Sequence, residues 1–511
     1  MNDSAVMADS DWLVRYRTTI YLALNGAVFL GAIVGAPLHG VPFGVVVYVC
    51  ALAALCTLPL LLLRRLNDQH ILLALFMADY FLCFGALDLQ ILLVGTDRLQ
   101  QVRTEFLTGP ELAILLGAAA VLAGSALGGA WGKPGQHRRP VAEWSAASLL
   151  VVGFAILVLG TAASLYFQII VTPSKLGFES ARGLASMSPA LTFMVMLGQM
   201  MLPVGILILA YGYSKFGGVF WTTLIILVVA SQVAVGFIED IKSVAIVGGV
   251  LVVMTRTVVT NRVPKGWLVY TVVFLVVAFP IFQAYRAASG ERGLDRAQAL
   301  RQLDKVLESA MAEREKEESG SHQRAETFLE RSSVKANVEL LFEHVGKDVP
   351  YLHGQSLVAI PMAFVPRLVV ADKEDLNIGA LFGKVIMKSD SGVFISISHL
   401  GELYWNFGWA GVLSGMLGVG AVLGFVGAKT DAAQGVTLTR VLILLATVKT
   451  LCIGFEGTMP ISYVLWMRSM AAIGLMHLIF ARSTASLPVK QERASSAVLP
   501  VVGPRFPNLL R

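Results

Sequence analysis

Long apolar runs separated by short polar segments recur along most of the chain. Each run has about the 20 residues that a helix needs to cross a bilayer. Twelve are expected, approximately at residues 18–36, 43–63, 71–95, 111–130, 146–170, 190–212, 218–237, 243–260, 267–286, 396–427, 437–456 and 460–481. Only helices or closed barrels satisfy the backbone inside lipid, and runs of this length indicate helices. The pattern therefore predicts an all-α polytopic membrane protein with about 12 transmembrane helices.

One long polar interruption divides these runs. Residues 1–286 hold nine predicted helices, 287–395 form one large loop, 396–483 hold the last three helices, and 484–511 form a tail rich in Ser, Pro and basic residues. The tail has the composition of a disordered segment. We therefore expect one membrane domain with a single large helical loop.

Composition and charge agree with this picture. Hydrophobic residues make up 56% of the chain, charged residues 14%, and the mean hydropathy is +0.71. In a membrane protein, excess Lys and Arg mark cytoplasmic loops, so the net charge of +6 does not indicate nucleic-acid binding. The basic short loops alternate along the chain, which predicts cytoplasmic termini and an external large loop. The four cysteines lie in apolar runs, so we expect neither a disulfide framework nor a metal site.

The large loop has two parts. Helical spacing of apolar residues predicts a soluble hairpin, whose second helix carries a face made of Val334, Val338, Leu341, Phe342 and Val345. The following segment from Tyr351 to Pro361 is apolar but too short to span, which is typical of an interfacial or re-entrant segment. Residues 377–391 are expected to be irregular.

Polar residues cluster at the start of the tenth predicted helix. His399, Glu402 and Asn406 fall within roughly 60° of one another on a helix. Ionisable groups in a membrane helix normally face the bundle interior or a wet cavity. The stripe is either a hydrogen-bonded seam between helices or a site at the outer end of the helix. Asp79 and Asp88, in the third predicted helix, are expected to be partnered acids.

Further charged groups fall near the predicted outer face. With the stripe they form the set Lys242, Arg286, Arg367, Lys373, His399, Glu402 and Asn406. Arg and Lys suit phosphate oxygens, and a carboxylate or histidine beside them can take a proton from an attacking hydroxyl. This set fits an anionic lipid-linked substrate, although a transporter carries the same residue types.

Several motifs add a family resemblance. Tyr351-Leu-His-Gly-Gln-Ser356, the prolines up to Arg367, Asp372-Lys373 and Gly401-Glu-Leu-Tyr-Trp-Asn-Phe-Gly408 resemble the O-antigen polymerases, the Wzy-type oligosaccharide repeat-unit polymerases. The resemblance implies a metal-independent, GT-C-like glycosyltransferase without a cofactor in the bacterial inner membrane. Its substrates would be undecaprenyl-diphosphate-linked oligosaccharides at the periplasmic face, used for lipopolysaccharide or exopolysaccharide biosynthesis. A flippase and a chain-length regulator are the expected partners.

The resemblance also implies residue roles. Arg286, Arg367, Lys242 and Lys373 would hold the diphosphate, and Glu402 or His399 would be the general base. Asn406 would position one of the two bases, and Tyr351 and Trp405 would stack on sugar or polyprenyl or belong to an interfacial aromatic belt. Lys242-Ser243 looks like the Arg-Ser turn of the related O-antigen ligases, with Lys in place of Arg. An O-antigen ligase, a lipid-linked oligosaccharide flippase and a scaffold subunit of an export complex remain alternatives.

Overall fold

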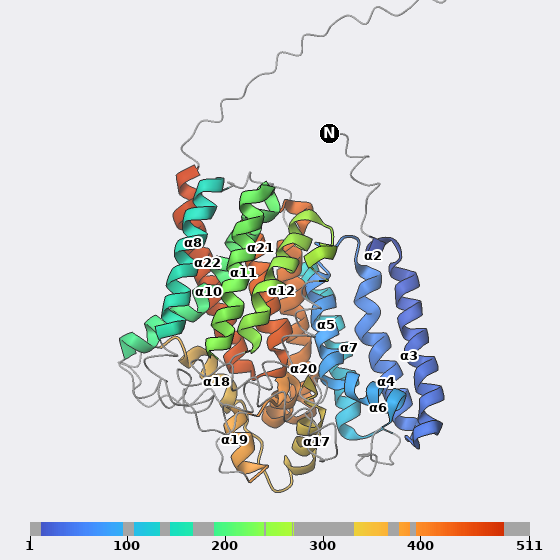
Figure 1. Ribbon diagram of the computed structural model, residues 1–511. Coiled ribbons are helices and arrows are strands. Elements are labelled where there is room, and N and C mark those ends of the chain that lie inside the picture. Colours follow the sequence, from blue (N-terminus) through green and yellow to red (C-terminus); the bar gives the residue numbers. More distant parts are fainter. Residues whose placement is uncertain are drawn as a thin grey trace, which may run out of the picture.

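The computed structural model describes residues 12–95, 107–132, 144–166, 189–239, 242–267, 269, 332–365, 378–388 and 395–484 (Figure 1). Helices form at eleven of the twelve predicted positions. The ninth predicted span, 267–286, lies almost wholly outside the described residues, as does the first helix of the predicted hairpin. In the described part of the chain the only β-type pairing is an isolated bridge between Val345 and Val349.

Within those residues, seven helical segments are long and apolar enough to cross a membrane. They are α3 (Arg17–His39), α4 (Phe43–Leu62), α7 (Gly109–Gly132), α8 (Ala146–Tyr166), α20 (Ser398–Thr430), α21 with its continuation (Leu438–Glu456), and α22 (Met459–Thr484). An eighth span arises if α5 (Ile71–Phe84) and α6 (Ala86–Val94), bent by 53° at Gly85, are taken together. The chain is therefore an all-α membrane protein.

Three further helices occupy predicted spans and contain shorter apolar stretches. They are α10 (Pro189–Phe216), α11 (Gly218–Glu239) and α12 (Lys242–Thr260). Helix α11 ends at Glu239 and α12 begins at Lys242. The sequence thus located the helices well, whereas the total of twelve spans goes beyond what the described residues establish.

Helix α20 lies against α7 with the two backbones in direct contact. A Cβ atom on Gly420 would lie 2.1 Å from the Val121 carbonyl oxygen, and one on Gly124 would lie 2.0 Å from that of Leu417. Small residues at such spacing let membrane helices approach closely. This contact places α20 inside the bundle, where α5, α7 and α21 also pack against it.

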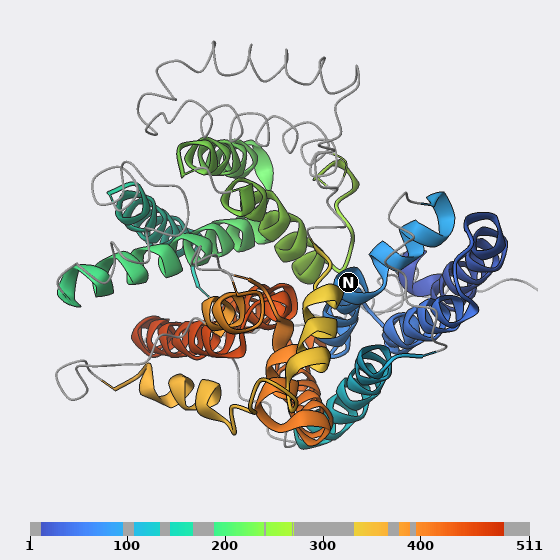
Figure 2. The ribbon, with the colours of Figure 1, turned by 90° about the horizontal axis from the view of Figure 1, so that it is seen from below.

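The short helices α17 (Lys335–His344), α18 (Gln355–Met362) and α19 (Ile378–Val385) gather at one end of the bundle, which we call the loop end (Figures 1 and 2). Val338 and Leu341 of α17 are fully buried, which confirms the predicted apolar face. They pack against Gly401 of α20. Helix α17 therefore rests on the membrane domain.

Helix α19 corrects the expectation of irregular structure between residues 377 and 391. Ile378 and Phe382 lie one turn apart, and Phe382 is fully buried with its ring centroid 6.3 Å from that of Trp405. A contact with a residue more than 20 positions away stabilises this turn, so local sequence did not reveal it. Pro361, the end of the predicted interfacial segment, lies in the last turn of α18, which ends at Met362.

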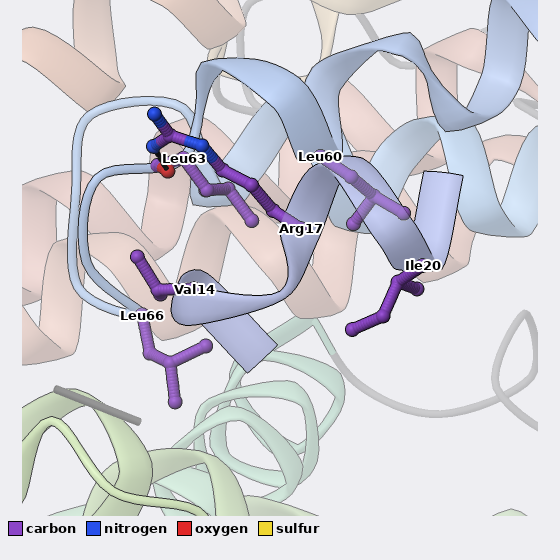
Figure 3. A pocket seen from close by; sticks show the side chains of 6 residues that line it. All are labelled: Val14, Arg17, Ile20, Leu60, Leu63 and Leu66. Carbon is purple, nitrogen blue, oxygen red and sulfur yellow. Dashed lines mark hydrogen bonds between the residues drawn. The ribbon is translucent and has the colours of Figure 1, made fainter. Parts of the chain in front are cut away.

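A small recess lies at the opposite end of the bundle, near α2 (Trp12–Arg15) (Figures 1 and 3). It is lined by Val14, Arg17, Ile20, Leu60, Leu63 and Leu66. The Arg17 guanidinium donates a hydrogen bond to the Leu63 carbonyl. The recess lies between the start of α3 and the end of α4. Arg17 is the one charged side chain among its aliphatic lining residues.

Candidate functional site

The predicted polar stripe lies in the first turns of α20, at the loop end. His399, Glu402 and Asn406 are each 0% exposed, so all three face the protein interior and not lipid. Leu400 and Tyr404, on the other side of the helix, are also buried. The start of α20 is therefore surrounded by protein on every side, and its polar groups must find partners there.

The Glu402 carboxylate ties two other elements to α20. Its Oε1 accepts a hydrogen bond of 2.6 Å from the Ser356 hydroxyl, which belongs to α18. Its Oε2 accepts a hydrogen bond of 2.8 Å from the Met459 backbone N–H, at the start of α22. Hydrogen bonds to a carboxylate are stronger than neutral ones. Glu402 thus connects α18, α20 and α22 at one point.

Asn406 completes the same junction. Its Nδ2 donates to the Ser356 hydroxyl and to the Glu402 carbonyl, each at 2.8 Å. Its Oδ1 accepts a hydrogen bond of 2.9 Å from the Gly354 N–H, at the start of α18. Both ends of the amide are satisfied, which fixes its orientation. The role of Asn406 in positioning Glu402, expected from the resemblance, is compatible with these contacts.

A kink at Gly408 adds two backbone contacts. Gly408 has φ 61° and ψ −144°, outside the helical region. The carbonyls of Trp405 and Asn406 accept hydrogen bonds from the N–H groups of Leu352 (3.0 Å) and His353 (3.1 Å). Two residues just before the helix break thereby bind the segment that leads into α18.

Tyr351 lies at this break. A Cβ on Gly408 would lie 3.4 Å from the Tyr351 ring, and the Tyr351 ring packs edge-on against Tyr404 at 6.4 Å. Trp405 is only 1% exposed and its indole N–H donates to the Pro350 carbonyl at 3.3 Å. Trp405 is therefore a core residue, and neither stacking on substrate nor a place in an interfacial belt describes it.

His399 differs from its neighbours in the stripe. Among the described residues, neither of its ring nitrogens has a hydrogen-bond partner. Aromatic rings flank the imidazole, with centroids of Phe455 at 5.2 Å and Tyr463 at 5.8 Å. An imidazole with both nitrogens free keeps its full capacity to donate one hydrogen bond and accept another.

The basic half of the predicted constellation is not placed. Lys242 begins α12, but its side chain is not described, and Arg286, Arg367 and Lys373 lie outside the described residues. Of the predicted site residues, the structure brings together His399, Glu402, Asn406 and Tyr351. In the parts of the chain that are described, no group of three potential ligands suited to a metal occurs.

A second polar cluster joins α17 to the bundle. The Lys335 Nζ lies 2.7 Å from Asp88 Oδ2 and 3.1 Å from Glu111 Oε1, and 4.4 Å from the centroid of the Tyr48 ring. Burial lowers the pKa of Lys335, but the two carboxylates outweigh that effect and raise its pKa overall. The prediction that Asp88 is a partnered acid is confirmed. For Asp79 the contact is weaker, a thiol from Cys83 at 3.9 Å.

Sequence reasoning missed two cations inside predicted spans. Arg468 of α22 donates to the Ala363 carbonyl at 3.3 Å and lies 5.9 Å from the Phe364 ring centroid, so it holds the end of α18. Lys449 is exposed on the continuation of α21. The signal was available, because ionisable residues within membrane helices are rare and mark functional positions.

Comparisons with protein-family models, with curated proteins and with solved structures returned no match.

Proposed function

We propose that this chain is a membrane glycosyltransferase that polymerises undecaprenyl-diphosphate-linked oligosaccharide repeat units at the periplasmic face of the bacterial inner membrane. The observation that supports it best is the junction at the loop end of α20. There the segments that carry the resemblance, around Tyr351 to Ser356 and Gly401 to Gly408, are hydrogen-bonded into one unit. A fully buried histidine with free ring nitrogens lies in the same helix start.

The junction favours a division of roles. Both carboxylate oxygens of Glu402 accept hydrogen bonds, from Ser356 and Met459, so Glu402 acts as the positioning residue. His399 then acts as the general base because its ring nitrogens have no competing partner among the described residues. It takes the proton of an acceptor hydroxyl, whose oxygen bonds to the anomeric carbon as the bond from that carbon to the diphosphate breaks.

The proposal predicts a specific defect in surface polysaccharide. A deletion strain should lose the ladder of long chains and keep a single capped repeat unit on a gel. His399→Ala should fail to restore the ladder at normal protein abundance, since the base is absent. A variant at a position remote from the junction and facing open space, Gly418→Ala, serves as the control and should restore the ladder.

Other outcomes identify the rivals. Complete loss of capped core, with polymer retained on the lipid carrier, means an O-antigen ligase, and loss without such polymer means a flippase. Full restoration of long chains by His399→Ala would refute the assignment of the base. Long chains made by both Glu402→Gln and Arg286→Ala would remove those residues from the site.

A further inference from the structure

The continuation of α21 presents a polar face inside the membrane domain. After α21 (Leu438–Thr447) the chain forms a π-helical turn, η4 (Val448–Cys452), and a 3₁₀ turn, η5 (Ile453–Glu456). Single π-turns within helices frequently occur at functional sites because they redirect side chains. Here the exposed positions are Lys449, Ile453 and Glu456, which recur at nearly helical spacing along one face.

The other faces of this segment are fixed by packing. Phe455 is fully buried, and its ring lies 5.0 Å from that of Phe76 in α5 and 5.2 Å from His399 in α20. On the α22 side, the Ser462 hydroxyl donates to the Gly454 carbonyl at 2.9 Å. The turn is thus attached to three helices, and the backbone of Lys449 is held in a fixed position.

Lys449 lies well inside the predicted span. It lies seven positions before Glu456, or about 10 Å along a helix at about 1.5 Å per residue. None of the ion pairs found among the described residues involves Lys449. A lysine within a membrane helix is costly unless it meets an anion or water. Water or a bound anion therefore has to meet its charge.

The two ends of the face have opposite charge. Glu456 lies at the loop end of the segment, in the turn η5 that packs against α5. An anionic group is therefore disfavoured beside Glu456 and favoured beside Lys449. Carboxylates accept hydrogen bonds from hydroxyl groups, so the Glu456 end suits a polyhydroxylated group. The face is matched to a molecule that carries a phosphate on one side and a sugar on the other.

We propose that Lys449 binds the phosphate or diphosphate of a membrane amphiphile and that Glu456 hydrogen-bonds the sugar attached to it. The inference rests on the proposed function, to which it adds a phosphate-binding residue among those that are described. The sugar would lie beside Glu456, and the adjacent Phe455 is buried with its ring centroid 5.2 Å from that of His399. The proposed sugar site thus lies on the same turn as the residue that contacts the proposed base.

The test is direct binding of a polyprenyl diphosphate to the purified full chain in nanodiscs, followed by native mass spectrometry or fluorescence. Lys449→Met keeps the length of the side chain and removes its charge, and loss of a charged hydrogen bond should weaken binding by about 10- to 100-fold. Lys449→Arg keeps the charge and should retain most of the affinity. Lys429→Met removes one charge from an exposed lysine at the other end of α20 and should bind like the parent protein.

The outcomes separate this inference from the function. Equal binding by Lys449→Met and the parent protein, or no binding by the parent protein, overturns the site. Binding that depends on Lys449 in a protein that makes no polymer supports the site and refutes the polymerase. A normal ladder in cells carrying Lys449→Met supports the polymerase and refutes the site. A neutral polyprenol should show no dependence on Lys449, and equal dependence would also refute the site.

Discussion

Replacing Gly424 by Ala should destabilise the protein through the contact between α7 and α20. A Cβ at this position would lie 2.1 Å from the Ser125 carbonyl oxygen, 2.8 Å from its carbon and 2.9 Å from the Gly129 nitrogen. All three are backbone atoms, so no side chain can rotate away. The helices must separate by about 1 Å to restore van der Waals distance.

The magnitude follows from overpacking. Inserting one methyl group into a well-packed interface typically costs about 1–3 kcal/mol, and a contact with fixed backbone belongs at the upper end of that range. Gly418, in the same helix, provides a matched control because nothing lies within 4 Å of its Cβ position. At that site Ala is the better helix former by up to about 1 kcal/mol, so Gly418→Ala should be neutral or stabilising.

The assay is unfolding of the purified protein in detergent, monitored by tryptophan fluorescence, for the parent and the two variants. Gly424→Ala should have a lower Tm than the parent, whereas Gly418→Ala should not. If both variants had the same Tm, the close contact of α7 with α20 would not contribute to stability, and the reasoning would be refuted. Polysaccharide production at low temperature provides an independent check that Gly424→Ala still folds.

Two further predictions concern the polar junctions. Lys335→Met should lower the free energy of unfolding by about 3–5 kcal/mol, because it leaves the acids Asp88 and Glu111 without a cation. Adding Asp88→Asn to Lys335→Met should recover part of that stability. The pKa of Lys335 is raised in the folded protein, so its stabilising effect is fully present below its ordinary pKa and is lost only as the pH rises through the raised value. Unfolding followed from pH 6 to pH 9 should therefore show no loss of stability from this group. A clear loss of stability over that range would contradict the ion cluster. Ser356→Ala should lower the free energy of unfolding by about 1–3 kcal/mol, since it leaves one oxygen of Glu402 and one amide hydrogen of Asn406 without their partner. An Ala variant of the exposed Ser414 is the control. Equal thermal stability of the two variants would show that the junction does not contribute to stability.

The sequence predicted the features that depend on local periodicity. Apolar runs located the helices, and the face of α17 followed from the spacing of Val338 and Leu341. The stripe on α20 was also expected to face the interior, because charged groups avoid lipid. These inferences need only the helical repeat and the cost of burying polar groups.

Features that depend on distant partners were not predictable in this way. Ser356 meets Glu402 across 46 positions of the chain, and no pattern in either segment indicates that pairing. The helical turn of α19 is stabilised by a contact between Phe382 and Trp405, which is likewise remote in sequence. Lys449 was overlooked for a different reason, because it was counted as part of an apolar span.

The backbone bonds beside Gly408 have a consequence for how this protein can change over evolutionary time. Because the contacts from Leu352 and His353 to the carbonyls of Trp405 and Asn406 join main-chain atoms, they do not depend on the side chains at positions 352 and 353. Gly408 is different, since its positive φ and the nearby Tyr351 ring leave little room for any other residue. The main-chain pairing therefore places a stronger constraint on the residue at Gly408 than on the residue at Leu352.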